Sequence, residues 1–231
     1  MIPAIIPYGD QAILINFEQK IDANINAKVI GLNNAIESAK IKGITFLIPA
    51  YCSLTIGYNP KIIDFSTLEL LLKQLVQNFS DTSEDLQYLG KKRKLRIPVC
   101  YEPPYALDLA DLSKEKDLPI KEIIALHTSQ TYKVYLLGFQ PGFAFMGTIK
   151  KALQCNRKIT PRLKVPANSV GIAGLQTGIY PSESPGGWQI IGRTPIQIFN
   201  PNLDNPFYFQ AGDEVTFFTI STQEFINYEN Q

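Results

Sequence analysis

The hydrophobic positions in the first third of the chain follow two patterns. From Asp22 to about Ile41 apolar residues recur at steps of three and four, which predicts an amphipathic helix. A second apolar stripe that includes Leu68 predicts another helix, opened by a capping box of Ser66 and Glu69. Strands are predicted around these helices at 4–17, interrupted by a turn, and at 44–48 and 53–58. This region therefore predicts a small α+β module of hairpin, helix, hairpin and helix.

The rest of the chain consists mainly of short β-branched runs between glycines and prolines. Positions 138–195 hold nine glycines and six prolines, a density that disfavours long helices. Two short helices are predicted, at 106–114 and at 120–127 after Pro119. Strands are predicted at 95–101, 134–137, 189–191, 196–199, 206–210 and 214–220. The pattern predicts an all-β barrel or sandwich with long loops.

A charged segment separates these two regions. Three acidic residues between 81 and 85 are followed by four consecutive cations from Lys91 to Lys94. Such a cationic run can mark a nucleic-acid or membrane patch, but next to compensating acids it is more typical of a solvated connector. We therefore predict two domains, at 1–90 and 91–231.

Composition and charge exclude several classes of function. Lys and Arg number 22 against 21 Asp and Glu, so the net charge of +1 disfavours a nucleic-acid partner. The single histidine, His127, excludes metal sites that need two imidazoles, and we expect no metal site. Three widely spaced cysteines form no CxxC pair and indicate reduced thiols. Neither a signal peptide nor a membrane span is predicted, so we expect a cytoplasmic protein with no membrane partner.

The segment 138–147 is the first candidate for a binding site. It packs three glycines and three phenylalanines into ten residues. Glycines let backbone amides approach a ligand and aromatic rings form apolar walls, so the segment is compatible with one side of a cleft. A glycine-rich turn whose aromatic rings fill the barrel core explains the same composition.

The second candidate runs from Pro161 to Pro195. Its two arginines, Arg162 and Arg193, together with hydroxyls and glycine amides, suit the binding of a carboxylate or a phosphate. Ser169 lacks the following helix that a nucleophile elbow requires, and the segment contains no P-loop for ATP. His127, at a predicted helix end, suits either a general base whose cation the helix dipole favours or a capping residue.

Motifs along nearly the whole chain resemble one known family. They lie at Gly9-Asp10, Leu126-His127, 137–143, 161–162, 166–174, 176–181, 184–195 and 210–213. Together they resemble the KipI/PxpB family, also called allophanate hydrolase subunit 1, which belongs to the carboxyltransferase-type domains. Asn168 departs from the pattern, because the family usually has glycine there.

The resemblance implies a small N-terminal α/β domain followed by a cyclophilin-like β-barrel domain. It also implies an enzyme subunit of an ATP-dependent 5-oxoprolinase, a hydrolase that opens 5-oxo-L-proline to L-glutamate. PxpA-like and PxpC-like subunits are the implied partners, and we expect the isolated chain to be inactive. ATP, with Mg²⁺, is the implied cofactor, bound here or on a partner subunit.

Two other functions stay open under the same resemblance. One is a KipI-like inhibitor that docks on a sporulation-type histidine kinase through Phe139, Phe143 and Phe145. The other is a carboxyltransferase-like subunit that acts on allophanate or urea derivatives through carboxybiotin.

The motifs also indicate candidate site residues. His127, Arg162 and Arg193 are the expected catalytic residues, with glycine amides as oxyanion donors. The expected substrate- or phosphate-binding residues are Gln140, Pro141, Gly142, Phe143, Ser169, Gln176, Tyr180, Ser184, Pro185, Gly186, Gly187 and Trp188. We expect the glycine amides, both guanidinium groups and the imidazole to converge on one concave surface.

Overall fold

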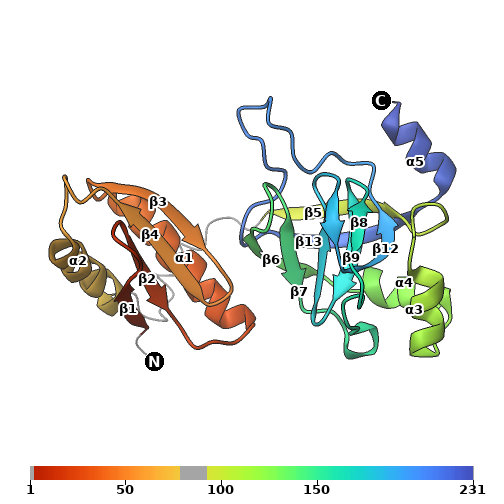
Figure 1. The fold of residues 1–231 in the computed structure, drawn as a ribbon, viewed down its shortest axis with the longest axis horizontal. Coiled ribbons are helices and arrows are strands. Elements are labelled where there is room, and N and C mark those ends of the chain that lie inside the picture. The colour runs from red at the N-terminus through yellow and green to blue at the C-terminus, as the bar shows by residue number, and fades with distance from the viewer. Residues whose placement is uncertain (1–2, 79–92, 231) are drawn as a thin grey trace. The chain divides into compact units, whose positions relative to one another are not determined.

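The computed structural model describes residues 3–78 and 93–230, shown in Figure 1. The chain divides between Lys92 and Arg93 into two compact units. The domain boundary expected at residues 90 and 91 lies outside the described residues, as does the acidic part of the charged segment. Each unit is therefore described by itself.

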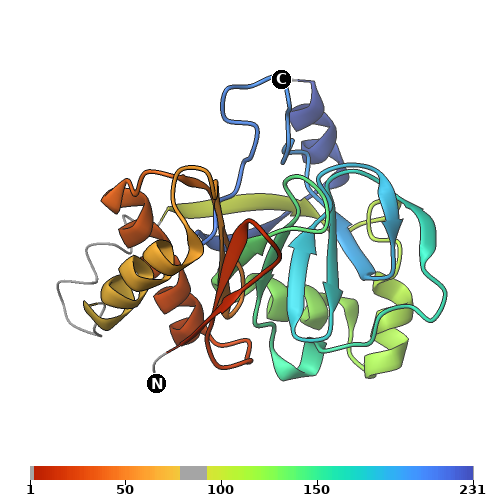
Figure 2. The same ribbon diagram turned by 60° about the vertical axis from the view of Figure 1, so that its left-hand side comes forward.

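The N-terminal unit is an antiparallel sheet with two helices packed against one face. Its strands, in the order β1-β2-β4-β3, are β1 (Ala4–Pro7), β2 (Ala12–Asn16), β3 (Ile44–Pro49) and β4 (Ser53–Tyr58). Helices α1 (Ala23–Ala39) and α2 (Phe65–Asn78) lie side by side on that face (Figure 2). Alternate strand residues such as Ile13 and Ile56 are fully buried against Leu32 and Leu68 of the helices. The predicted order of hairpin, helix, hairpin and helix is confirmed.

The predicted capping box of α2 is wrong. Asp64 caps this helix, because its carboxylate accepts hydrogen bonds from the Thr67 backbone amide at 3.0 Å and hydroxyl at 2.7 Å. Ser66 instead lies within the first turn of α2, and Glu69 forms an ion pair with Lys73 at 2.9 Å. A carboxylate that precedes the helix satisfies the free amides better than a hydroxyl already inside it.

The C-terminal unit contains a closed barrel of seven strands in the cyclic order β10-β7-β6-β13-β5-β12-β9. These strands are β5 (Lys94–Cys100), β6 (Tyr132–Leu137), β7 (Ala144–Gly147), β9 (Ser169–Ala173), β10 (Gln176–Ile179), β12 (Gln189–Arg193) and β13 (Glu214–Ile220). Parallel pairing of β13 with β5 joins the last strand of the unit to the first. The predicted fold class, an α+β chain whose second part is a β-barrel, is confirmed.

A bidentate ion pair supports this parallel junction. Arg93 donates to both carboxylate oxygens of buried Asp213, through Nε at 2.8 Å and Nη2 at 2.5 Å. Asp213 also accepts a hydrogen bond from the backbone amide of Gln210 at 2.7 Å, which holds the turn before β13. The motif at 210–213 and one cation of the charged run therefore have a structural role in the barrel.

The remaining elements cover the barrel or project from it. They are the two-stranded ribbon of β8 (Arg162–Val165) and β11 (Ser184–Gly186), the 3₁₀ turn η2 (Lys151–Leu153), and helices α3 (Leu109–Lys116), α4 (Ile120–Thr128) and α5 (Thr222–Glu229). Figures 1 and 2 agree in placing α5 at the opposite end of this unit from α3 and α4. No regular strand forms at 196–199 or 206–210, which share only a Phe199–Phe207 bridge. Prolines at 195, 201 and 206 withhold the amide donors that a ladder needs.

Neither a membrane-spanning helix nor a metal cluster is found in the described ranges. No helix there is long and apolar enough to cross a membrane. No group of three or more His, Cys, Asp and Glu side chains there lies close enough to hold a metal ion.

The observed cap of α2 makes a prediction that separates it from the capping box. Asp64→Ala removes the carboxylate that binds the first amides, so the variant should unfold at a lower urea concentration than the wild type. Ser66→Ala, the matched control, should leave the urea midpoint nearly unchanged. A larger loss in Ser66→Ala than in Asp64→Ala would contradict this assignment.

Candidate functional site

A cavity of about 370 Å³ opens beside the barrel where three loop segments meet. The segments follow β6, precede β8, and run from the end of β10 to β12. We call this space the aromatic cavity. Its lining residues are Phe139, Phe143, Phe145, Arg157, Pro161, Tyr180, Pro185, Gly186, Gly187 and Trp188.

Phe143 is the centre of the aromatic wall. Its ring centroid lies 4.6 Å from that of Phe145, 5.0 Å from Tyr180 and 5.4 Å from Trp188, the last two edge to face. Phe143, Tyr180 and Trp188 are buried, so these contacts are strengthened by loss of water from the rings. The aromatic residues of 138–147 thus serve both expected purposes, since they pack on one another and also form a cavity wall.

Gly186 lets the loop approach Tyr180 closely. A Cβ atom at this position would lie 2.5 Å from the Tyr180 hydroxyl, so any larger residue would displace the ring. Burial raises the pKa of Tyr180, against the lowering effects of the Trp188 backbone amide and of the cations Arg157 and Arg162. The phenol therefore stays neutral near pH 7 and can donate a hydrogen bond into the cavity.

A buried carboxylate fastens the loops around the cavity. Asp108, which precedes α3, is only 1% exposed and binds Arg162 through both guanidinium nitrogens. It also accepts from Lys158 Nζ at 2.9 Å and from the Ile190 backbone amide at 2.7 Å. We call this set of contacts the Asp108 clamp, because it ties β8 and the loop before it to β12 and α3.

The electrostatics of the clamp favour the charged form. Burial alone would raise the pKa of Asp108, but the hydrogen bonds from Arg162, Ile190 and Lys158 together bring it below the usual range. Asp108 is therefore ionised at neutral pH, and Arg162 is engaged with it. The expectation that Arg162 offers a free guanidinium to a substrate is wrong, since the fork of this side chain is occupied by a carboxylate of the same chain.

Arg157 is the cation that remains at the cavity. Its side chain is exposed, and none of the described carboxylates forms an ion pair with it. The Lys158 amide donates to the Gly187 carbonyl at 2.7 Å, which holds the backbone next to Arg157 against the opposite loop. The cavity thus combines an aromatic wall with one guanidinium at its rim.

Phe139 forms part of the rim in an unfavourable conformation. Its φ is 69° and its side chain is 69% exposed, although its ring still meets Phe143 edge to face. A bulky residue in the left-handed region costs about 1–3 kcal/mol, and exposure of a phenyl ring adds no stability. Strain of this kind points to a functional constraint at the rim.

His127 lies inside the barrel core. Its side chain is 0% exposed and stacks on Phe217 with a centroid distance of 4.6 Å. Nδ1 lies 2.7 Å from the Tyr101 hydroxyl and Nε2 lies 3.0 Å from Thr177 Oγ1. Because the Thr177 hydroxyl donates to the Gly171 carbonyl, it accepts from Nε2–H, and Nδ1 accepts from Tyr101.

Burial lowers the pKa of His127 to about 3. The expectation of a histidine cation favoured by the dipole of α4 is wrong, because loss of water around the ring outweighs the dipole. The ring also does not cap the helix. Both ring nitrogens are bound within the core, so the geometry gives His127 a structural role in place of the acid–base role expected from the sequence.

Arg193 lies away from the aromatic cavity. Its Nε donates to the Ala167 carbonyl at 2.8 Å, and its guanidinium carbon lies 6.0 Å from the ring centroid of Phe225 in α5. Arg162, by contrast, binds Asp108 at the start of α3, and α3 and α5 lie at opposite ends of this unit (Figure 1). The expected convergence of both arginines and the histidine on one concave surface is therefore wrong.

The other candidate residues divide among several places. Phe143, Tyr180, Pro185, Gly186, Gly187 and Trp188 line the aromatic cavity. Gln140, Pro141 and Gly142 line a neighbouring space of about 340 Å³ that shares Phe139 with it. Ser169, Gln176 and Ser184 line neither: Ser169 is buried in β9, Gln176 begins β10 and Ser184 begins β11. The binding roles of the cavity residues stay predictions.

Asn168 replaces the family's usual glycine without loss of the turn. Its φ is 62°, a left-handed conformation that asparagine adopts more readily than most residues with a side chain. Its amide donates to the Tyr180 carbonyl at 2.6 Å, and its carbonyl accepts from the Thr194 amide at 3.0 Å. The position demands a backbone conformation, which explains the preference for glycine.

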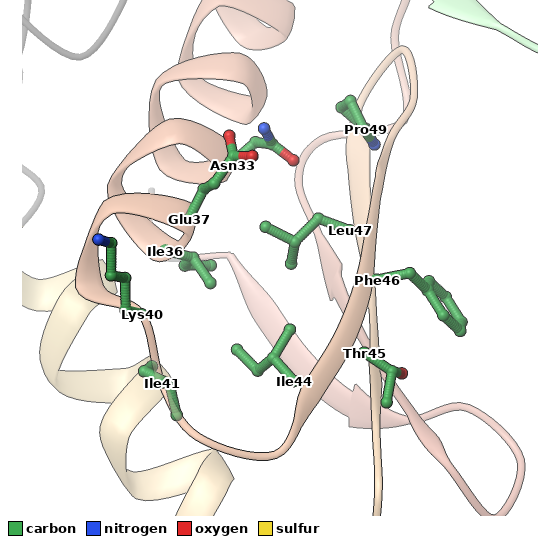
Figure 3. Close-up of a pocket in the computed structure, with 10 residues that line it drawn as sticks. All are labelled: Asn33, Ile36, Glu37, Lys40, Ile41, Ile44, Thr45, Phe46, Leu47 and Pro49. Carbon is green, nitrogen blue, oxygen red and sulfur yellow. The ribbon is translucent and has the colours of Figure 1, made fainter. Parts of the chain in front are cut away.

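The N-terminal unit has a cavity of its own, of about 360 Å³, between α1 and β3 (Figure 3). Apolar side chains from the core, Ile36, Ile44 and Leu47, project into it. Its charged lining residues, Glu37 and Lys40, both come from the end of α1 and have opposite sign. This cavity lacks convergent polar groups, so we place the candidate site in the C-terminal unit.

Sequence reasoning missed Asp108, Arg157 and Lys158. A signal for the last two was present, because the stretch from Arg157 to Arg162 carries three cations around Pro161. Asp108 gave no local signal, since an aspartate before a short helix is most simply read as an exposed cap.

Comparison with known proteins places the chain in a family. The family model described as carboxyltransferase domain, subdomain C and D, matches residues 3–209. The chain belongs to this carboxyltransferase domain family. The family resemblance seen in the sequence motifs is thereby confirmed.

Two relatives of this carboxyltransferase domain are similar over most of their length. The B-type 5-oxoprolinase subunit of Bacillus subtilis (strain 168) is 38% identical, with 96% of this chain and 95% of that protein covered. The B-type 5-oxoprolinase subunit of Escherichia coli O157:H7 is 35% identical, with 90% and 92% covered. Among solved structures, the crystal structure of TTHA0988 superposes with a TM-score of 0.80 at 33% identity, covering 91% of this chain and 40% of that one.

A more distant likeness concerns the fold alone. The urea carboxylase of Kluyveromyces lactis superposes with a TM-score of 0.73 at 20% identity, covering 96% of this chain and 22% of that one. A barrel and a separate sheet of this kind thus also occur within a much longer enzyme.

The burial of His127 makes a prediction for the carboxyltransferase domain in solution. Because this is the chain's only histidine, its imidazole NMR signals are unambiguous. They should show the Nε2–H tautomer and no titration between about pH 8 and pH 5, whereas the urea-unfolded chain should titrate near pH ~6.5. Titration of the folded chain near neutral pH would contradict the assigned core position.

The same burial sets a direction for stability. The unfolded imidazole binds a proton below about pH 6.5, but the folded one stays neutral until its pKa of about 3. The unfolded state therefore binds more protons in this window, and the free energy of unfolding should decrease as the pH falls through it. Urea unfolding at several pH values measures this slope.

Proposed function

We propose that this chain is a subunit of an ATP-dependent 5-oxoprolinase, which opens 5-oxo-L-proline to L-glutamate, and that the aromatic cavity is the site where this subunit takes part. The observation that supports the proposal is the cavity itself, formed within the family motifs shared with proteins named as 5-oxoprolinase subunits of the B type. Its aromatic wall suits a small ring and its guanidinium suits an anion.

The chemistry explains why the reaction consumes ATP. The lactam is an amide stabilised by resonance, and its five-membered ring is little strained, so water attacks it slowly. Phosphorylation of the carbonyl oxygen supplies a leaving group, and the products are L-glutamate, ADP and phosphate. In this scheme the residues of the chain bind and orient the ring, and the aromatic wall keeps bulk water from it.

The aromatic cavity does not fit ATP. A triphosphate needs several free cations or a row of backbone amides, as in known phosphate sites. Arg157 alone is free here, because Lys158 and Arg162 are bound to Asp108. We therefore place ATP and Mg²⁺ on a partner subunit and derive no step through them on this chain.

Exposed apolar residues around the cavity favour assembly with partners. Phe139, Ile159 and Leu163 come from the segments that build the cavity, and all three side chains are exposed. Apolar groups clustered in this way are typical of a surface that another protein covers. We propose PxpC-like and PxpA-like subunits as the partners, a cytoplasmic location, and no activity of the isolated chain.

The same exposed residues favour one second candidate function. An apolar rim led by Phe139 also fits a binding surface for helices of a histidine kinase. In that case the chain would act as an inhibitor and would perform no chemistry.

An assay of the assembled complex tests the proposal. The chain is purified with the PxpA-like and PxpC-like subunits of its own organism, and formation of ADP and L-glutamate is measured with 5-oxo-L-proline. L-Glutamate should form only when every subunit is present. Autophosphorylation of a sporulation-type histidine kinase is measured in parallel, and its inhibition without any glutamate formation would favour the second function.

The strained Phe139 gives a further prediction with two readouts. Phe139→Gly and Phe139→Ala both remove the ring, so both complexes should form L-glutamate more slowly at low substrate. Only glycine relieves the left-handed conformation, so Phe139→Gly should be more stable to urea than Phe139→Ala by about 1 kcal/mol. Equal stability of the two variants, or unchanged turnover, would show that the rim conformation has no such role.

A further inference from the structure

The aromatic cavity contains one positive charge that no described carboxylate neutralises. Lys158 and Arg162 donate to Asp108, and Lys164 pairs with Glu183 at 3.0 Å. Arg157, which lies within the same segment, has no such partner in the described ranges and lines the cavity. The pairing pattern therefore leaves one guanidinium available to an external anion.

The backbone places this guanidinium next to the aromatic wall. A Cβ atom built on Gly187 would lie 3.8 Å from the Arg157 Cβ, so the root of the side chain lies over the loop that precedes Trp188. The Arg157 charge also reaches the buried hydroxyl of Tyr180. An anion bound by Arg157 would consequently lie beside Tyr180 and Trp188.

The shape and charge of the cavity limit the class of ligand. One guanidinium fork matches one carboxylate, which has a single charge and two oxygens in the fork's plane. The buried rings of Phe143 and Trp188 favour an apolar or planar body next to that carboxylate. The volume of about 370 Å³ accommodates a small ring.

Resting on the proposed function, we infer that this chain itself binds the substrate, as a small cyclic carboxylic acid whose carboxylate pairs with Arg157 and whose ring lies against Phe143 and Trp188. For a 5-oxoprolinase this ligand is 5-oxo-L-proline. The neutral Tyr180 hydroxyl is the polar group available to the ring amide. Neither Arg162 nor Arg193 contacts the ligand in this arrangement.

Trp188, the only tryptophan of the chain, reports on occupancy of the cavity. The experiment follows tryptophan fluorescence of the full chain while 5-oxo-L-proline is added. A saturable change is expected for the wild type, and Arg157→Ala should weaken the affinity about tenfold to a hundredfold. Arg157→Lys, which keeps the charge but loses the fork, should fall between them.

Two controls make the measurement specific. Lys164→Ala removes the same unit of charge from a side chain outside the cavity and should bind like the wild type. 2-Pyrrolidinone, which has the lactam ring without the carboxylate, should bind Arg157→Ala and the wild type equally. A wild-type chain without a saturable response, or equal affinity of Arg157→Ala and the wild type for 5-oxo-L-proline, would overturn the inference.

The assembled complex separates failure of this inference from failure of the proposed function. If the wild-type complex forms L-glutamate but Arg157→Ala leaves its KM unchanged, the inference is wrong while the proposed function stands. If the wild-type complex forms no L-glutamate, the proposed function is wrong whatever Arg157 does to binding. Support for both requires turnover by the wild type and a raised KM in Arg157→Ala.

Discussion

The carboxylate of Asp108 is the contact on which the candidate site depends. It lies at the start of α3 and collects donors from Lys158, from Arg162 in β8 and from the Ile190 amide in β12. The ribbon of β8 and β11 is a sheet separate from the barrel, so hydrogen bonds within the barrel sheet do not position it. A charge buried in this way is tolerated only with several donors, and satisfying them draws the loops together.

The clamp also decides which cation can act on a ligand. Two of the basic residues in the same segment lose their availability to Asp108, while Arg157 keeps its own. Since the Lys158 amide is bound to Gly187, the clamp and this backbone contact hold Arg157 at the edge of the aromatic wall. The same arrangement that stabilises the loops therefore shapes the binding chemistry of the cavity.

His127 shows how burial changes the meaning of a residue. On an exposed helix end an imidazole would titrate near neutral pH, but among Tyr132, Phe217 and the barrel strands its neutral form is favoured. Its two hydrogen bonds join Tyr101, just after β5, to Thr177 in β10. A fully satisfied polar network of this kind favours one arrangement of the core over others.

The sequence by itself determined the order of helices and strands in the N-terminal unit, the β-rich character of the second unit and the family. Periodicity and turn residues act locally, so the helix from Asp22 and the strands at 53–58 and 214–220 were predictable. It also directed attention to Phe143, Tyr180, Gly186 and Trp188, which do line one cavity. Cap choice at Asp64 and the irregular stretches at 196–199 and 206–210 were mispredicted, because competing local patterns had similar merit.

Only the tertiary structure decided which charged groups are free and which are paired. Asp108 and Arg162 are 54 positions apart in the chain, and nothing local to either residue reveals their pairing. Likewise, neither the burial of His127 nor the distance of Arg193 from the cavity follows from the residues beside them. Desolvation and ion pairing depend on neighbours brought together by the barrel, and these neighbours are set by folding over long separations in sequence.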